Sequence, residues 1–186
     1  MQIRPATPAD LPALADIDAT SESAEYLHID RTSEGFAISW KIQPRPLREK
    51  RTHRHALADE QSFAIRQIVE GIQEGIALVA EHDGVPVASI AAITDPESQT
   101  LRLLDLRVDF DHRRQGLASA LLFQLISHSR EQGLRAVAAQ CQADDFPAIQ
   151  LLSKLSFEPT GLDTHYRSNH DLVKESVVLF FYIATE

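Results

Sequence analysis

The sequence predicts an α/β (α+β) fold, in which a mixed central sheet of about six to seven strands is flanked by helices. Apolar runs with the period of a strand alternate with segments of helical period along the back half of the chain. An Asp83-Gly84 pair between two apolar runs indicates a hairpin. A chain of 186 residues buries roughly 70% of the surface that its unfolded form exposes. We therefore expect one domain over residues 1–186 that needs no disulfide or structural metal.

The front of the chain carries weaker signals for regular structure. Residues 1–4 are expected to form a short strand, and Thr7 or Asp10 is expected to cap the helix that follows. A further helix is predicted over residues 63–71, where Ile and Val recur at helical spacing and a glycine ends the run.

A basic stretch at residues 41–55 carries six Lys or Arg and one Glu in a chain that is otherwise acidic. Pro44 and Pro46 disfavour a helix in its first half. We expect a solvated loop here; the alternative is that the stretch flanks a phosphate-bearing cofactor or a substrate. His53 and His55 alternate with cations, which disfavours a metal site.

The back half predicts a regular succession of strands and helices. Leucine and isoleucine recur at helical spacing in two segments, and short apolar runs separate these segments. The expected strands are residues 76–81, 85–94, 101–108, 136–141, 157–162 and 177–183, and the expected helices are residues 117–130 and a helix capped by Asp144 or Asp145.

Charge and composition exclude several classes of function. The balance of 18 Lys plus Arg against 27 Asp plus Glu gives a net charge of −9, which repels a nucleic-acid backbone. Cys141 is the only cysteine, so a reducing compartment fits best. The sequence has no apolar run of about 18 residues and no cluster with metal-ligand spacing. We expect a cytoplasmic protein with no nucleic-acid partner, no membrane partner and no metal.

The informative motif lies between a predicted strand and a predicted helix. The turn carries Arg113 and Arg114, and Gly116 and Ala118 then open the helix. The first N–H groups of a helix have no partner within it and attract anions, and small residues let a pyrophosphate approach the backbone. One glycine is too few for the dinucleotide loop, and the Gly-Lys-Ser/Thr of an NTPase is absent. The motif therefore predicts an anion site.

Residues 113–118, Arg-Arg-Gln-Gly-Leu-Ala, fit the R/Q-x-x-G-x-G/A motif and resemble the GCN5-related N-acetyltransferases (GNAT), whose turn holds the pyrophosphate of acetyl-CoA. Val108 stands five residues before Arg113, as in the fourth strand of that family. A second resemblance, to the streptothricin acetyltransferases, covers most of the chain. It is carried by residues 35–38, Pro44-Arg45, Gln142, Gly161-Leu162-Asp163, Tyr166 and the run from Glu175 to Tyr182, while residues 145–148 and Ser156-Phe157 resemble the GNAT N-x-x-A and G-F segments.

The resemblance implies direct transfer of acetyl from acetyl-CoA to a primary amine of a small, streptothricin-like molecule. The alternatives are acetylation of another metabolite or of a protein amine, and a non-catalytic acyl-CoA-binding module. A homodimer is expected by analogy with the superfamily. The resemblance also implies an oxyanion donor at the backbone N–H of Val108. The residues that it assigns to the cosubstrate are Leu106, Val108, Arg113, Arg114, Gln115, Gly116, Ala118, Ser119 and Asp145.

The candidate base is Asp105, and the sequence makes it conditional on a β-bulge. Leu104 stands where streptothricin enzymes carry Glu, and strand alternation puts Leu104 and Asp105 on opposite faces unless a bulge intervenes. The alternative is that Asp105 forms a salt bridge with Arg107 or Arg102.

Two further positions depart from the family pattern. Gln140 stands where the family pattern has a second acidic residue. The acceptor pocket therefore lacks two negative charges that the family pattern would supply. The tyrosine that commonly protonates the departing thiolate falls at Leu152, which has no proton to donate. Tyr166 is the candidate acid in its place, with Ser153 or water as alternatives, and a wall of the substrate pocket is the other interpretation of Tyr166.

Overall fold

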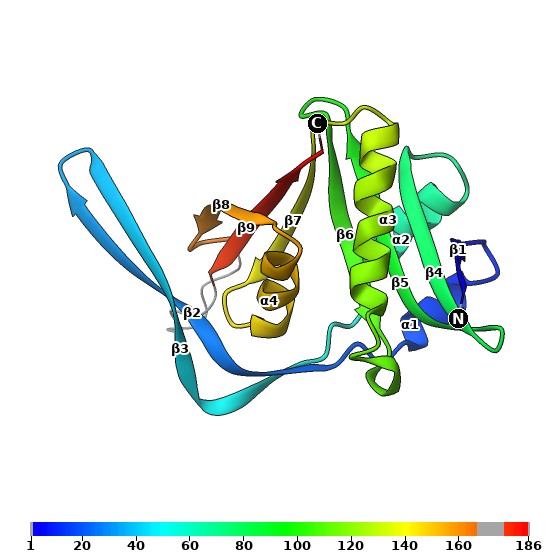
Figure 1. Cartoon of the computed structure of the whole chain (residues 1–186), viewed down its shortest axis with the longest axis horizontal. Coiled ribbons are helices and arrows are strands. Elements are labelled where there is room, and N and C mark those ends of the chain that lie inside the picture. The colour runs from blue at the N-terminus through cyan, green and yellow to red at the C-terminus, as the bar shows by residue number, and fades with distance from the viewer. Residues whose placement is uncertain (1, 167–176, 186) are drawn as a thin grey trace.

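A mixed sheet of seven strands forms the body of the computed structural model, which describes residues 2–166 and 177–185. The strands are β1 (Gln2–Pro5), β4 (Gly75–His82), β5 (Val85–Asp95), β6 (Thr100–Val108), β7 (Ala136–Gln142), β8 (Glu158–Asp163) and β9 (Val178–Ala184). Their order across the sheet is β1-β4-β5-β6-β7-β9-β8 (Figure 1). Every neighbouring pair is antiparallel except β6 and β7, which are parallel. The predicted fold class is confirmed.

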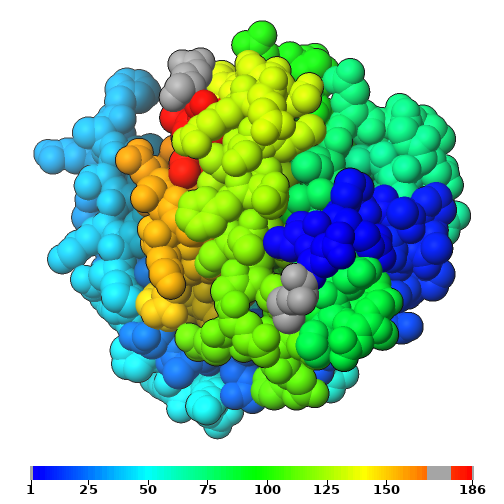
Figure 2. All heavy atoms as spheres, turned by 45° about the vertical axis from the view of Figure 1, so that its right-hand side comes forward, coloured from blue at the N-terminus to red at the C-terminus, as the bar shows by residue number. Residues whose placement is uncertain are grey.

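Helices cover both faces of the sheet. They are α1 (Leu11–Asp16), α2 (Asp59–Val69), α3 (Leu117–Glu131) and α4 (Phe146–Lys154). Leu14 of α1 and Ile65 of α2 pack with Ala91 in one core, whereas Ile90 belongs to the larger core under α3. Successive residues of a strand point to opposite faces, so this division places α1 and α2 on the side opposite α3. Figure 2 shows α3, in yellow-green, covering the middle of its face of the molecule.

The strands and helices predicted for the back half are confirmed within one or two residues at each end. The hairpin turn at Asp83-Gly84 joins β4 to β5, with both residues in the left-handed region at φ 51° and 80°. Asp10 stands at the N-cap position of α1, as predicted, but its carboxylate accepts from Thr7 and not from the helix. Glu175 lies outside the described residues.

The prediction of a solvated loop over residues 41–55 is wrong. These residues belong mainly to β3 (Ala37–His53), which pairs antiparallel with β2 (Ser21–Glu34) in a separate two-stranded sheet. Pro44 faces Leu27 and Pro46 faces Glu25 in this register. A hairpin of two strands leaves half of its N–H groups facing outward, so it tolerates prolines that an inner strand would exclude.

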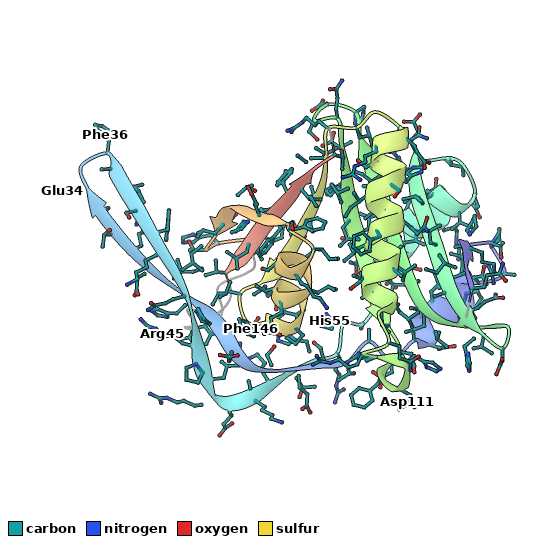
Figure 3. The ribbon with its side chains drawn as sticks, viewed as in Figure 1. Glu34, Phe36, Arg45, His55, Asp111 and Phe146 are labelled. Atoms are coloured by element: carbon teal, nitrogen blue, oxygen red, sulfur yellow. The ribbon has the colours of Figure 1, made fainter. Side chains whose placement is uncertain are left out.

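The β2–β3 hairpin has a packed base and a projecting tip. Leu27 and Ile29 contact the larger core, whereas Ile38, Trp40 and Phe36 toward the tip are exposed. Figure 3 shows Glu34 and Phe36 at the far end of the hairpin, away from the sheet, and His55 and Phe146 near its base. The base of the hairpin is therefore the part that can contribute to a site on the body of the protein.

A charge pair fixes the first strand to the first helix and predicts acid sensitivity. The Arg4 guanidinium donates from Nη1 and Nη2 to the two oxygens of Asp10 at 2.8 Å, and Thr7 donates from its N–H and hydroxyl at 2.7 Å. Arg4 holds the pKa of Asp10 well below its ordinary value. A carboxyl whose pKa is lower in the folded state stabilises the fold above its unfolded pKa, and this contribution is lost as pH falls below about 4.

We expect Asp10→Asn to lower the free energy of unfolding by about 2 kcal/mol at pH 7, because charge-assisted hydrogen bonds are lost. The deficit relative to the wild type should shrink at pH 3. Urea denaturation followed by circular dichroism at the two pH values measures both effects, with Asp16→Asn on an exposed position of the same helix as control. An equal deficit at pH 7 and pH 3 would contradict this account of Asp10.

Candidate active site

The site begins where β6 and β7 separate. Their parallel ladder has only three residue pairs, from Thr100 with Ala136 to Arg102 with Ala138. Beyond Arg102, β6 stays paired with β5 and β7 stays paired with β9. A cavity of about 2020 Å³ is lined by both strands beyond this point and by the start of α3, α4 and the base of the hairpin. The cavity therefore lies at the ends of several elements that are distant in the sequence.

A β-bulge in β6 meets the condition that the sequence set for Asp105. Ala91 pairs with Asp105 and Ala92 pairs with Leu103, which leaves Leu104 without a partner in the ladder. The carbonyl of Leu104 accepts a hydrogen bond of 2.9 Å from the Gln61 amide of α2. The extra residue puts Leu103 and Asp105 on opposite faces, so Asp105 faces the side of α1 and α2.

The structure also bears out the salt-bridge alternative for Asp105, with Arg107 as its partner. Arg107 donates from Nε and Nη2 to the two carboxylate oxygens at 2.7 and 2.8 Å, and from Nη1 to the carbonyl of Leu14 at 3.2 Å. The Arg107 side chain is 2% exposed and that of Asp105 is 12% exposed. Both oxygens of Asp105 thus hold a buried guanidinium that ties β6 to α1.

The turn after β6 has the shape of an anion site. Gly116 is the N-cap of α3 with φ 83°, and an added Cβ there would meet no atom within 4 Å. The N–H of Ala120 donates to the carbonyl of Gly116, and it is the first N–H group of α3 that has a partner among the described residues. No described residue accepts from the N–H groups of residues 117–119, and these residues line the cavity. Arg114, also left-handed at φ 61°, is exposed beside them.

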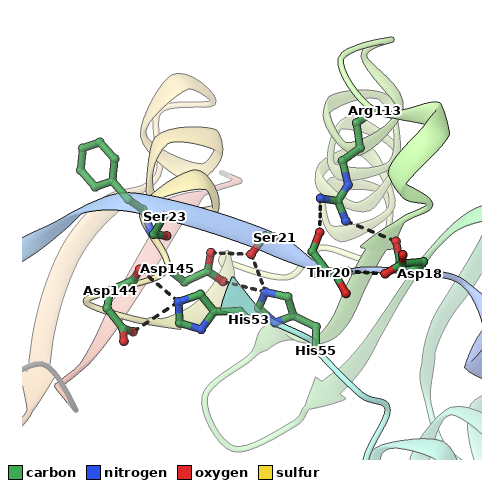
Figure 4. Close-up of polar contacts among 10 residues, drawn as sticks. Asp18, Thr20, Ser21, Ser23, His53, His55, Arg113, Asp144 and Asp145 are labelled. Atoms are coloured by element: carbon green, nitrogen blue, oxygen red, sulfur yellow. Dashed lines mark hydrogen bonds and ion pairs between the residues drawn. The ribbon is translucent and has the colours of Figure 1, made fainter. Parts of the chain in front are cut away.

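Arg113, by contrast, points its guanidinium at protein carbonyls. It donates from Nε to the carbonyl of Val108 at 3.2 Å. Figure 4 shows its two other hydrogen bonds, from Nη2 to the carbonyl of Asp18 at 3.3 Å and from Nη1 to the carbonyl of Thr20. Its Cζ lies 5.2 Å from the centre of the Phe110 ring. Arg113 therefore fastens the turn to the segment that enters the hairpin, a long-range role that the motif does not reveal.

The opposite wall is the start of α4, held by the base of the hairpin. Asp145 stands at the N-cap position, as predicted, but its side chain accepts no hydrogen bond from the helix. The hydroxyl oxygen of Ser23 accepts from the N–H of Phe146 at 3.1 Å and takes the place of that cap. Arg51 forms a salt bridge with Asp144, which is buried.

Two histidines, His53 at the end of β3 and His55 just after it, reach this wall, and the sequence predicted no role in the site for either of them. His53 Nε2 lies 3.2 Å from the carbonyl of Asp144, and His55 Nε2 lies 2.9 Å from the hydroxyl of Ser21. The two rings stack with centres 5.6 Å apart. A His-x-His pattern places both side chains on one side of an extended segment, and that pattern was the available signal.

Tyr166, Leu152 and Gln140 line the cavity, whereas Gln115 is exposed and lies outside its lining. Tyr166 is 49% exposed and makes an edge contact with Phe180, whose ring centre is 6.0 Å away. Leu152 is buried at the cavity and Gln140 is exposed there. Burial raises the pKa of the Cys141 thiol, so this cysteine stays protonated at neutral pH.

Comparison with known proteins decides the family. The model of the Acetyltransferase (GNAT) family matches residues 35–157. The chain belongs to this family. N-acetyltransferase family 8 member 3 of Mus musculus is 31% identical over 111 residues, which are 58% of this chain and 49% of that protein. N-acetyltransferase 8 of Homo sapiens is 33% identical over 87 residues, 45% of this chain and 38% of that protein. The chain thus spans about half the length of these curated relatives or less.

Solved structures share the fold of this GNAT chain. Nourseothricin acetyltransferase superposes with a TM-score of 0.79 at 18% identity, covering 100% of this chain and 98% of that one. A candidate streptothricin acetyltransferase from Bacillus anthracis str. Ames, in complex with acetyl coenzyme A, gives 0.78 at 15% identity and covers 98% of both chains. Membership in GNAT and its fold, predicted from the motif at residues 113–118, are confirmed.

Within the part of the chain that the structure describes, no helix has both the length and the apolar character to cross a membrane. No three metal-binding side chains gather anywhere in the same ranges. The cytoplasmic location and the homodimer stay predictions.

The buried salt bridge between Asp105 and Arg107 predicts that Asp105 stabilises the fold. Asp105→Asn leaves the Arg107 guanidinium buried beside an uncharged partner, so we expect a loss of about 3–5 kcal/mol in the free energy of unfolding. The double variant Asp105→Leu, Arg107→Met should recover most of that loss. Chemical denaturation measures both, with the exposed Arg102→Gln as control. If Asp105→Asn unfolds with the same free energy as the wild type, Asp105 has no structural role.

Proposed function

We propose that this chain is an acetyl-CoA-dependent N-acetyltransferase that transfers acetyl directly to the primary amine of a small molecule. The observation that carries the proposal is the cavity between β6 and β7, which ends at the open N-terminus of α3. Family membership and an acetyl coenzyme A complex with the same fold support it. A single GNAT domain over residues 1–186 is part of the proposal.

The residues at the turn fit a pyrophosphate. Leu117, Ala118 and Ser119 offer backbone N–H groups at a helix start, where the helix dipole favours an anion. Gly116 leaves the approach open because it has no side chain. Gln115 and Arg114 are exposed beside it, so the Arg114 guanidinium can add charge-assisted hydrogen bonds.

The backbone of β6 fits the role assigned to Leu106 and Val108. The N–H of Asp109 donates to Val87 of β5 at 2.8 Å. Successive residues of a strand direct their N–H groups to opposite edges, so the N–H groups of Leu106 and Val108 face the cavity edge. A donor at Val108 can stabilise the oxyanion that forms when an amine attacks the thioester carbonyl.

The transfer needs no covalent enzyme intermediate. Acetyl-CoA supplies an acyl thioester whose carbonyl carbon a neutral amine attacks; the C–N bond forms and the C–S bond breaks. The amine nitrogen gives up one proton and the thiolate takes one. We keep Tyr166 as the candidate donor to the thiolate, because it lines the cavity and Leu152 has no proton to give.

The amine substrate is proposed as streptothricin-like, with another metabolite or a protein amine as the second candidate. Positions 104 and 140 hold Leu104 and Gln140 in place of the acidic residues of the family pattern. Carboxylates there would strengthen the binding of a polycationic amine, so their replacement favours the second candidate. Release of CoA thiol from acetyl-CoA, with streptothricin, polyamines, simple alkylamines and α-amino amides in parallel, separates them. Binding of acetyl-CoA without turnover of any amine would favour the non-catalytic acyl-CoA-binding module.

Gly116→Asp tests the cosubstrate site. The new carboxylate repels the pyrophosphate at the helix start, so we expect the affinity for acetyl-CoA in titration calorimetry to fall about 100-fold. Gly71→Asp is the matched control, because Gly71 is also left-handed, at φ 73°, and an added Cβ there would also meet no atom within 4 Å. Equal affinity in the two variants would overturn the assignment of the turn.

A further inference from the structure

The side chains of Ser21 and Asp145, which lie at the starts of two different elements, both contact the ring of His55 (Figure 4). Its Nε2 lies 2.9 Å from Ser21 Oγ, at the start of β2, and 3.3 Å from Asp145 Oδ2, at the start of α4. Ser21 Oγ in turn lies 3.5 Å from Asp145 Oδ1. The hydroxyl and the carboxylate therefore meet the same nitrogen of the ring.

The donors and acceptors among these three side chains determine the tautomer. An ionised carboxylate only accepts hydrogen bonds, so Asp145 requires a donor at Ser21 and at His55 Nε2. Ser21 satisfies this by accepting from Nε2–H and donating its own proton to Asp145. The ring nitrogen Nδ1 then carries the lone pair, and none of the described residues hydrogen-bonds to it. The arrangement orients the ring and leaves one basic nitrogen unused.

His55 also sits in the cavity with the groups assigned to the cosubstrate. It lines the same space as Val108 and Gly116, and its side chain is 39% exposed. Its backbone is left-handed at φ 46°, an uncommon conformation for a residue other than glycine. Such conformations are held by the surrounding structure and concentrate at functional sites.

Four ionisable groups from different parts of the chain act on His55. Burial lowers the pKa of His55 below its ordinary value, Asp145 and Asp105 oppose this shift, and His53 and Arg113 add to it. The lowered pKa keeps the ring neutral at pH 7, the form that accepts a proton. Asp145 would stabilise the imidazolium that forms when Nδ1 takes one.

We propose that His55 is the general base of the acetyl transfer, with Asp145 and Ser21 as positioning residues. This inference rests on the proposed function. As the C–N bond forms, Nδ1 accepts the proton that the amine nitrogen releases; the C–S bond breaks with its electron pair going to sulfur. The proton then leaves the ring for solvent, which restores neutral His55, and the thiolate takes its proton from Tyr166 as proposed above. Asp105 is the weaker candidate, because both of its oxygens already hold the buried guanidinium of Arg107.

The first test compares pH profiles for the amine with the highest turnover. His55→Asn retains a residue type that tolerates the left-handed backbone. We expect kcat/KM to fall about 100-fold, with the affinity for acetyl-CoA unchanged within about twofold, and the profile to lose the acidic limb that His55 adds to the limb set by the pKa of the amine itself. Asp145→Asn should move that limb to lower pH, because the carboxylate no longer favours the imidazolium. A merely structural role for Asp145 would not move it.

His28→Asn is the matched control. His28 also contacts a carboxylate, with Nε2 2.9 Å from Asp30 Oδ1, but it lies in the hairpin and outside the cavity lining. Its substitution should leave the acidic limb in place. A His55→Asn variant that retains turnover within threefold of the wild type would overturn the base role alone. A wild-type chain that turns over no amine would overturn the proposed function together with it.

A second test needs no turnover. Long-range ¹H–¹⁵N correlation spectra of the intact protein report the tautomer and the charge of each imidazole, and His55→Asn identifies the signals of His55. We expect a neutral Nε2–H ring at pH 7.5, with a pKa below the ordinary value for histidine because the ring is partly buried. An Nδ1–H tautomer, or a ring already charged at pH 7.5, would overturn the proposal whatever the kinetics show.

Discussion

Three residue pairs hold β6 to β7, and past Arg102 the backbone groups on the facing edges of the two strands border a cavity instead of a neighbouring strand. Unpaired N–H and C=O groups inside a protein are costly unless a ligand, water or side chain satisfies them. Such an edge is tolerable where it borders a binding site. The opening therefore supplies both the space for a cosubstrate and the donors that such a ligand would need.

The base of the hairpin braces this opening. Arg113, in the turn before α3, fastens the chain at Thr20, and the N–H of Leu27 donates to Ala143 ahead of α4 at 2.7 Å. Arg51 on the returning strand pairs with Asp144. These contacts join the two walls of the cavity through a segment that belongs to neither. The basic residues of β3 are thus explained in part, because Arg51 balances the charge of the buried Asp144 carboxylate.

Local signals predicted the sheet and its helices because the hydrophobic pattern and the end signals of each element lie within a few residues of one another. The period of residues 101–108 and the glycine at 116 needed no knowledge of distant partners. The hairpin was missed because Pro44, Pro46 and dense charge resemble a loop, and only pairing with β2 makes them a strand. The cluster at His55 could not be predicted from the sequence for a similar reason. Ser21 and Asp145 lie 124 positions apart, and no spacing rule relates residues at that separation.

The carboxylates that line the cavity affect which amine substrates it can bind. Asp105 is paired with Arg107, Asp145 contacts Ser21 and His55, and Glu22, which also lines the cavity, lies 3.7 Å from Lys50. Each of these three carboxylates therefore already has a partner. An alkyl ammonium has a pKa near 10, whereas an α-amino group has one near 8. A histidine base gives little help in the initial deprotonation of the former and lies much nearer to the latter. On the proposal that His55 is the base, the reaction therefore favours an amine that is already partly neutral at pH 7.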